Sequence, residues 1–132
     1  MMKFILDNNQ ITSKLLSSNR DDLFTLSEIA NEFNPGNKGY SRIQKSNIKI
    51  VDLKDKHINA MIEIMTLYGD DIELIDLAEA EGMGDVAILA YVLGEIQHPD
   101  MFDLNQEFTI VTSDKGIRKY CDIYNIKHCN AL

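Results

Sequence analysis

Residues 2–9 read MKFILDNN, and residues 108–114 read FTIVTSD. Each stretch is a short apolar run that leads into an aspartate, Asp7 near the start of the chain and Asp114 near its end. Continuous apolar runs of this kind are typical of strands covered on both faces in a parallel sheet. Functional crevices in open α/β sheets lie beyond the carboxyl ends of the strands. We therefore expect the carboxylates of Asp7 and Asp114 to converge at one edge of the sheet.

Strand and helix patterns alternate along the rest of the chain. We expect strands over residues 2–6, 23–26, 48–51, 108–112 and 126–129. Between them we expect a short helix capped by Thr12 or Ser13, a helix capped by Ser27 that runs to Phe33, and a loop or short helix over 38–46. We also expect helices over 54–68, 85–93 and 114–124, with 71–80 as a further candidate. This alternation predicts an α/β fold: a single three-layer α/β/α domain over residues 1–132 with a mainly parallel central sheet.

Composition agrees with one globular domain and indicates a reducing compartment. The chain has 132 residues, of which 45% are hydrophobic and 26% charged, which is ordinary for a globular protein. Cys121 and Cys129 have neither the spacing of a zinc ribbon nor that of a disulfide framework. We see no signal peptide and no apolar run long enough to span a bilayer. These features predict a cytoplasmic protein without a membrane partner.

The net charge of −8 argues against a nucleic-acid partner when it is taken as a whole. Residues 52–107, however, contain fourteen acidic and only two basic residues, so the acidity belongs to this central segment. Two basic clusters lie outside it, one of Lys38, Arg42, Lys45 and Lys49 and one of Lys115, Arg118 and Lys119. They suit either the margins of an RNA groove or scattered solvent-facing charge. Tyr40 fits a stacking or a packing role.

Four acids stand at the ends of predicted elements. Asp7 follows the first strand, Glu32 lies in the helix after the second, Asp85 opens an apolar helix, and Asp114 follows the fourth strand. With their surroundings FILDNN, LFTLSEIANEF, GMGDVAILA and VTSDKG, these acids resemble the motifs of the PIN-domain family of metal-dependent nucleases. Each motif alone has low specificity, whereas their order and spacing cover nearly the whole chain.

The resemblance implies that the four acids are catalytic and bind Mg²⁺ or Mn²⁺. Four further residues are candidates to contact these ligand side chains rather than the metal itself: Asn9, Glu81, Thr112 and Ser113. Some family members carry an additional acid beside the third or fourth position, and here position 113 is serine. Both cations are hard and prefer oxygen ligands, and they activate water and stabilise charge on phosphate. The implied reaction is hydrolysis of RNA phosphodiester bonds by an endoribonuclease, usually leaving a 5′-phosphate.

Three biological roles fit such a nuclease. The leading role is that of the toxin in a toxin–antitoxin pair, because small stand-alone PIN domains are often toxins. The resemblance then implies an antitoxin partner and a homodimer. The others are an RNA-maturation nuclease and a phage-encoded nuclease. A catalytically silent PIN-like module that binds RNA or a protein is the alternative from another functional class.

Structural roles for the same acids stay open at this stage. Asp7 or Asp114 alone would suit an Asx-turn or a helix N-cap. Glu28 lies one helical turn before Glu32 and could take its place if the strand ended earlier. A receiver-like phosphate-handling domain also gathers acids at strand ends, but only Val51-Asp52 matches its central strand. The three histidines share no metal-ligand spacing, which argues against a zinc site.

Overall fold

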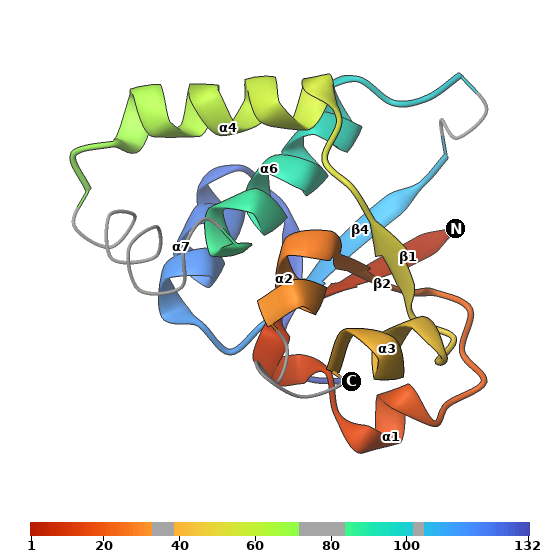
Figure 1. The fold of residues 1–132 in the computed structure, drawn as a ribbon. Coiled ribbons are helices and arrows are strands. Elements are labelled where there is room, and N and C mark those ends of the chain that lie inside the picture. The colour runs from red at the N-terminus through yellow and green to blue at the C-terminus, as the bar shows by residue number, and fades with distance from the viewer. Residues whose placement is uncertain (33–38, 72–83, 102–104) are drawn as a thin grey trace.

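A five-stranded parallel sheet forms the centre of the protein (Figure 1). The computed structural model describes residues 1–32, 39–71, 84–101 and 105–132. Within them, the strand order is β3-β2-β1-β4-β5, and every neighbouring pair is parallel. The strands are β1 (Met2–Leu6), β2 (Leu23–Leu26), β3 (Lys49–Val51), β4 (Glu107–Val111) and β5 (Lys127–Cys129). The predicted α/β fold with a parallel central sheet is confirmed.

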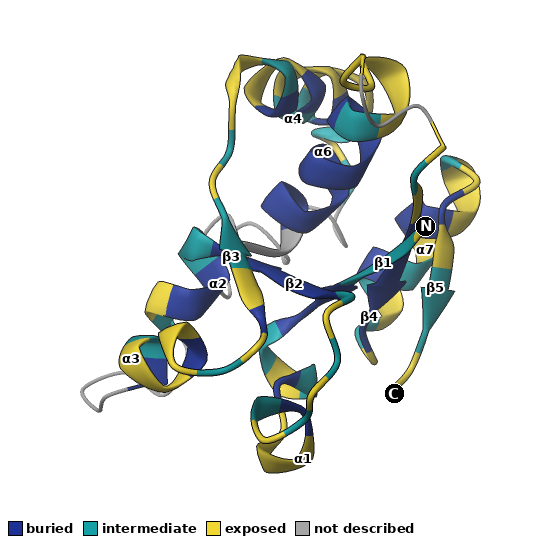
Figure 2. Cartoon of the chain, turned by 90° about the vertical axis from the view of Figure 1, so that its right-hand side faces the viewer, coloured by how far each residue is buried: buried dark blue, intermediate teal, exposed yellow. Residues whose placement is uncertain are grey.

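Helices pack on both sides of this sheet (Figure 2). On one side lie α1 (Ser13–Leu16) and α3 (Gly39–Gln44), and on the other lie α4 (Asp55–Tyr68) and α6 (Gly84–Gln97). The helix α7 (Lys115–Ile123) packs against α6. Two short elements, η1 (Asn8–Gln10) and α2 (Ser27–Glu32), directly follow β1 and β2. The apolar strands are therefore covered on both faces, as their sequences predict.

Most differences from the sequence expectations concern element ends. Ser27 is the first residue of α2 rather than the residue before it. Asp114 has an extended backbone and precedes α7, so it is the N-cap and not the first helical residue. The expected helix over 85–93 continues to Gln97. Of the helix expected over 71–80, only Asp71 belongs to the described residues. Phe33 and Lys38 also lie outside them.

The direction of the chain across the sheet reverses between β1 and β4. The connection after β1 leads to β2 on one side, whereas the connection after β4 leads to β5 on the opposite side. Open α/β sheets bind their ligands at such a switch point, beyond the carboxyl ends of the strands. The two strands pair along their whole length, from Met2 with Glu107 to Leu6 with Val111. Asp7 and Thr112, the next residues of each strand, therefore leave the sheet side by side.

The apolar helix α6 forms the largest part of the core on its side of the sheet. Its residues from Val86 to Leu93 are all buried, in agreement with a sequence that is apolar on every face. Each residue of β2 is buried as well. A helix without a polar face must be enclosed, and α4 packs across α6. The surface of α4 thereby becomes the outer surface of this layer.

A histidine and a glutamate hold α4 and α6 together. The His57 side chain is 1% exposed, and its Nδ1 accepts the backbone N–H of Lys54 at 2.8 Å. Its Nε2 lies 3.1 Å from Glu95 Oε1, while Lys56 Nζ contacts Glu95 Oε2 at 2.9 Å. Burial lowers the pKa of His57, so the neutral ring accepts at Nδ1 and donates from Nε2. His57 therefore stabilises the start of α4 through Lys54 and the contact of α4 with α6 through Glu95, and this role requires no metal.

Gly94 lies where α4 and α6 approach most closely, and its replacement by alanine is expected to destabilise the protein. A Cβ there would lie 2.8 Å from His57 Cδ2 and 3.0 Å from the Lys56 carbonyl oxygen. Alanine in place of a helical glycine normally stabilises a helix by about 1 kcal/mol. Overpacking reverses the sign here, and we expect Gly94→Ala to lower the free energy of unfolding by about 1–3 kcal/mol in urea titrations. Asn59→Ala on the exposed side of α4 is the control, with a change within about 0.5 kcal/mol. A gain in stability for Gly94→Ala would contradict the close helix contact.

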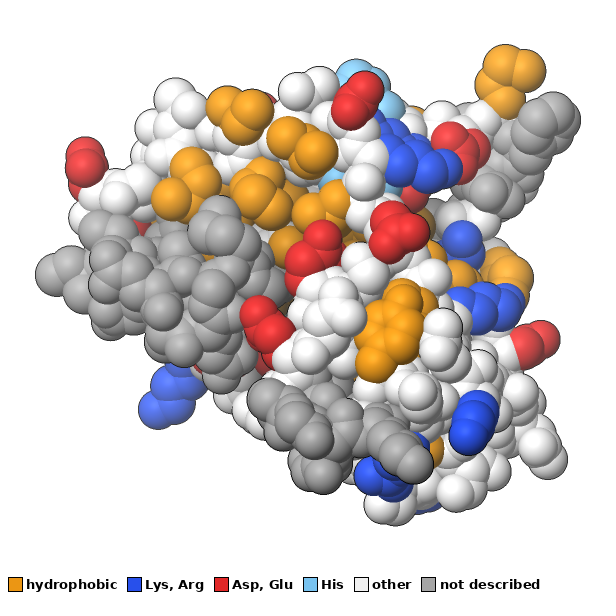
Figure 3. All heavy atoms as spheres, in the orientation of Figure 1, with side chains coloured by type: hydrophobic (Ala, Val, Ile, Leu, Met, Phe, Trp, Pro, Cys, Tyr) orange, Lys and Arg blue, Asp and Glu red, His pale blue; other side chains and the backbone are white. Residues whose placement is uncertain are grey.

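An apolar strip remains exposed on α4. Ile58 and Ile62 lie one helical turn apart and are 46% and 59% exposed. In the space-filling view, hydrophobic side chains gather along this part of the surface (Figure 3). Exposed apolar patches of this kind often mark contact surfaces for other proteins.

Candidate active site

Asp7 is a buried carboxylate at the carboxyl end of β1. The residue is 4% exposed. Its Oδ1 accepts the backbone N–H of Asn8 at 2.7 Å, and its Oδ2 accepts the hydroxyl of Thr112 at 2.8 Å. The Asp7 backbone N–H donates to the Val111 carbonyl at 3.0 Å, which continues the pairing of β1 with β4. The side chain is therefore held rigidly at the switch point of the sheet.

Thr112 connects the two strand-end aspartates. It is fully buried, and while its hydroxyl donates to Asp7, the same oxygen accepts the backbone N–H of Asp114 at 3.1 Å. One hydroxyl group thus determines both the orientation of the Asp7 carboxylate and the path of the chain into Asp114. The sequence also predicts that Thr112 contacts the acids rather than a metal itself, and the hydrogen bonds fit this role. An effect of Thr112 on a metal ligand stays a prediction.

Asp114 caps the helix that follows it. Its Oδ1 accepts the backbone N–H groups of Gly116 at 2.8 Å and Ile117 at 3.2 Å. The structural role considered for this residue, an N-cap, is therefore present. Its Oδ2 makes no hydrogen bond to any residue in the described part of the chain, so this oxygen stays available to a ligand. Capping and ligand binding can coexist because they use different oxygens of one carboxylate.

The environment of Asp7 makes its negative charge unfavourable. Burial raises the pKa of Asp7 above its ordinary value of 3.8. The hydrogen bonds from Thr112 and Asn8 act in the opposite direction, and the nearby charge of Asp114 raises the pKa further. A cation bound between the two carboxylates would offset both the burial and the repulsion. Such a shift at a strand end is typical of a functional site, although it also occurs in structural networks.

The remaining sequence candidates have different positions in the structure. Ser113 is exposed, and its hydroxyl accepts a hydrogen bond from Gln10 Nε2 at 3.3 Å. Asn9 is exposed in η1. Glu32 is half-buried at the end of α2. Asp85 is the second residue of α6, but its side chain lies outside the described part of the structure, as does Glu81 altogether.

Two of the four predicted metal ligands are therefore brought together, and the full set stays a prediction. In residues 1–32, 39–71, 84–101 and 105–132, no group of three or more His, Cys, Asp or Glu side chains is arranged to hold a metal ion. Mg²⁺ nevertheless often uses only one or two protein carboxylates and takes its other ligands from water and substrate phosphate. Asp7 and Asp114, both hard oxygen donors, fit that requirement.

The basic margins of an RNA groove stay a prediction. Lys119 Nζ contacts Asp71 Oδ2 at 2.9 Å, and Lys49 Nζ donates to the Asp21 carbonyl at 3.2 Å, so these two lysines have protein partners. Arg42 and Lys45 are exposed near the end of α3. These contacts favour ordinary surface roles for Lys49 and Lys119 over an RNA groove.

Sequence reasoning missed a second polar site near the amino ends of β1 and β4. Its members include Lys3, His57 and Tyr91, which line one pocket. A tyrosine inside the otherwise apolar α6 was the available signal, because its hydroxyl needs a partner when the ring is buried.

Asp114 offers a direct test of its capping role. Asp114→Ala removes the acceptor for two backbone N–H groups, and we expect the free energy of unfolding to fall by about 0.5–2 kcal/mol. Asp114→Asn keeps a side-chain oxygen at the cap and is expected to remain close to wild type, since asparagine is among the preferred N-cap residues. Urea unfolding monitored by circular dichroism measures both. Equal losses for the two variants would mean that the charge of Asp114, and not its capping oxygen, stabilises α7.

No protein-family model matches the sequence, and the search of curated proteins gives no match either. The parallel five-stranded sheet is compatible with a PIN domain but does not identify one. In the described residues, no helix combines the length and apolar character needed to cross a membrane.

Proposed function

We propose that this protein is a Mg²⁺- or Mn²⁺-dependent endoribonuclease of the PIN type. The observation that carries the proposal is the buried Asp7 carboxylate, which lies beside Asp114 at the switch point of a parallel sheet. Open α/β folds place their ligands at this point. Two adjacent carboxylates with little solvent around one of them are a suitable environment for a hard divalent cation. Glu32 and Asp85 complete the proposed set of ligands.

The chain's own residues have distinct tasks in this proposal. Thr112 orients Asp7, and the first turn of α7 holds Oδ1 of Asp114, which would leave Oδ2 to bind the cation. The bound cation would supply charge stabilisation for the phosphodiester and a route to an activated water. The preorganised carboxylates avoid the cost of rearrangement when substrate arrives. RNA would enter across the carboxyl ends of β1 and β4.

A non-catalytic PIN-like module that binds RNA or protein is the second candidate. The observation in its favour is that both carboxylates of the described pair already accept hydrogen bonds from the protein, from Asn8 and Thr112 at Asp7 and from Gly116 and Ile117 at Asp114. In that case the acids would only shape the turns that follow β1 and β4. A cleavage assay separates the two candidates.

The first test is the dependence of RNA cleavage on metal. We expect the purified protein to cut a 5′-labelled, mixed-sequence single-stranded RNA in the presence of Mn²⁺, to lose this activity in EDTA, and to regain it when Mn²⁺ is restored. Denaturing gel electrophoresis measures the products. Cleavage that persists in EDTA would refute a metal-dependent mechanism, and absence of cleavage under all conditions would favour the non-catalytic module.

The toxin of a toxin–antitoxin pair is the biological role that we favour for this nuclease. The exposed apolar strip on α4, with Ile58 and Ile62, supports a protein partner, either an antitoxin or a second copy in a homodimer. An RNA-maturation enzyme or a phage-encoded nuclease would use the same chemistry on a different substrate. A cytoplasmic location fits each of these roles.

A further inference from the structure

A polar pocket lies at the opposite end of β1 from Asp7. Its volume is about 250 Å³. It is lined by Lys3 of β1, Gln106 before β4, residues of the segment after β3 and of the start of α4, Tyr91 and Glu95 of α6, and Asp100. Lys3 and Asp7 are four residues apart, which corresponds to roughly 13 Å along a strand. The pocket is therefore separate from the proposed metal site.

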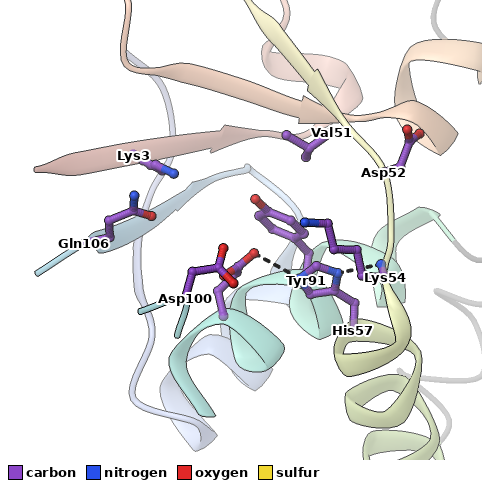
Figure 4. A pocket seen from close by; sticks show the side chains of 9 residues that line it. Lys3, Val51, Asp52, Lys54, His57, Tyr91, Asp100 and Gln106 are labelled. Atoms are coloured by element: carbon purple, nitrogen blue, oxygen red, sulfur yellow. Dashed lines mark hydrogen bonds and ion pairs between the residues drawn. The ribbon is translucent and has the colours of Figure 1, made fainter. Parts of the chain in front are cut away.

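The hydroxyl of Tyr91 is the most unusual group in this pocket. Tyr91 is only 5% exposed, and its ring packs against His57 with a centroid distance of 4.6 Å and against Phe108 at 6.3 Å. The hydroxyl points into the pocket (Figure 4) and makes no hydrogen bond to any described residue. A tyrosine whose ring is buried usually has its hydroxyl hydrogen-bonded, and here the room for a partner lies inside the pocket. Burial and the charges of Glu95 and Asp100 raise the pKa of Tyr91, so its hydroxyl keeps its proton and is a donor.

Two acids of the pocket wall, Glu95 and Asp100, share one cation within the protein, Lys56. Glu95 accepts from His57 Nε2 at 3.1 Å and from Lys56 Nζ at 2.9 Å, so both of its oxygens are engaged. Asp100 Oδ1 lies 3.4 Å from the same Lys56 Nζ. The Asp52 carboxylate points away from the Tyr91 hydroxyl (Figure 4). Lys56 thus offsets one of the two negative charges of Glu95 and Asp100.

The basic groups of the pocket have no such counter-ions. Lys3 Nζ lies 5.0 Å from the centroid of the Phe24 ring and 6.0 Å from that of Phe108, and neither Lys3 nor Lys54 forms an ion pair with a described residue. The ends of both lysine side chains extend toward the space above Tyr91 (Figure 4). Gln106 adds a carboxamide at the same rim. Two ammonium groups and a phenolic donor around one space favour an anion with several acceptor oxygens.

We propose that this pocket binds a small oxyanion, either a phosphate or a carboxylate group, through Tyr91, Lys3 and Lys54. The volume is near the lower end of the range for small-molecule sites, which is about 300–1,000 Å³, so the ligand is a compact one. Because the pocket lies at the end of β1 away from Asp7 and its lining includes residues of β1, β3, α4 and α6, binding there does not depend on the proposed nuclease reaction.

Titrations with inorganic phosphate and with succinate test this proposal and distinguish a phosphate ligand from a carboxylate ligand. We expect saturable changes in the amide chemical shifts of residues around Tyr91 with at least one of the anions, at constant ionic strength set with chloride. Tyr91→Phe keeps the ring and its packing, and it is expected to weaken binding about tenfold because a hydrogen bond to a charged group is lost. Lys3→Gln is expected to weaken binding as well.

Two matched variants control for general effects. Tyr124→Phe removes another tyrosine hydroxyl that has no hydrogen-bond partner among the described residues, but outside this pocket. Lys45→Gln removes an exposed positive charge elsewhere. Both are expected to bind like the wild type, and thermal unfolding checks that all variants fold. Shifts that never saturate, or equal weakening by Tyr91→Phe and Tyr124→Phe, would overturn the proposal. It would also be overturned if single-stranded RNA, but neither small anion, shifted these amides.

Discussion

Asp7→Asn is expected to lower the rate of RNA cleavage by more than about 100-fold, because loss of even an outer partner of a metal ligand costs about 10–100-fold. Asparagine has nearly the shape of aspartate and can still accept a hydrogen bond from the Asn8 backbone. It lacks the negative charge that a divalent cation requires. Initial rates on labelled RNA at saturating Mn²⁺, measured for variant and wild type, give the ratio. Unchanged cleavage would exclude Asp7 as a metal ligand.

The same substitution is expected to leave the protein at least as stable as the wild type at neutral pH. Burial raises the pKa of Asp7 in the folded state above its ordinary value of 3.8. Between 3.8 and this raised pKa, the folded state therefore binds more protons than the unfolded state. The stability of the wild type should therefore decline as pH increases from 3.8 through the raised pKa, relative to Asp7→Asn. Urea unfolding at a series of pH values in EDTA measures this difference. A variant that loses activity and keeps its stability has lost a functional group and not a structural one.

Asp21→Asn is the matched control for Asp7→Asn. Asp21 is exposed beside β2, and only its backbone carbonyl takes part in a described hydrogen bond, with Lys49. We expect wild-type cleavage and a stability within about 0.5 kcal/mol of wild type. A similar loss of cleavage in both variants would indicate that overall charge, and not the site at the end of β1, controls the reaction.

The sheet could be predicted from the sequence because the relevant signals are local. The mainly apolar runs that end before Asp7 and Ser113 are short and flanked by polar residues, and these properties indicate buried strands without knowledge of their neighbours. Alternation with helical segments then requires parallel pairing. The adjacency of Asp7 and Asp114 follows from one further fact, the pairing of β1 with β4.

The details of the site depended on contacts that a sequence does not reveal. The two hydrogen bonds of the Thr112 hydroxyl require both strand ends to be in place. The role of His57 as a partner of Glu95 depends on the crossing of α4 and α6, so spacing rules for metal ligands could not detect it. The unpaired hydroxyl of Tyr91 is recognisable only after the ring is placed in the core. Periodicity predicts which face is buried, but not which polar group on it remains without a partner.

Thr112→Val is expected to destabilise the protein by about 1–3 kcal/mol and to slow RNA cleavage by about 10–100-fold. Valine has the shape of threonine, so packing around this fully buried position is preserved. The substitution leaves Asp7 Oδ2 and the Asp114 backbone N–H without their partner, and a buried carboxylate oxygen that loses its hydrogen bond is costly. Urea unfolding and initial cleavage rates measure the two effects.

Two further threonine variants separate the hydroxyl from the methyl group. Thr112→Ser retains the hydroxyl and is expected to keep most of the activity. Thr109→Val, within β4 itself, removes a hydroxyl that donates only to the weak acceptor Met2 Sδ, and it should be close to neutral. If the cost of Thr112→Val arises from the charge on Asp7, the same substitution in an Asp7→Asn background should cost less, because no buried charge is then left unpaired. Equal costs in the two backgrounds would mean that the lost bond to Asp114, and not the one to Asp7, stabilises this edge of the sheet.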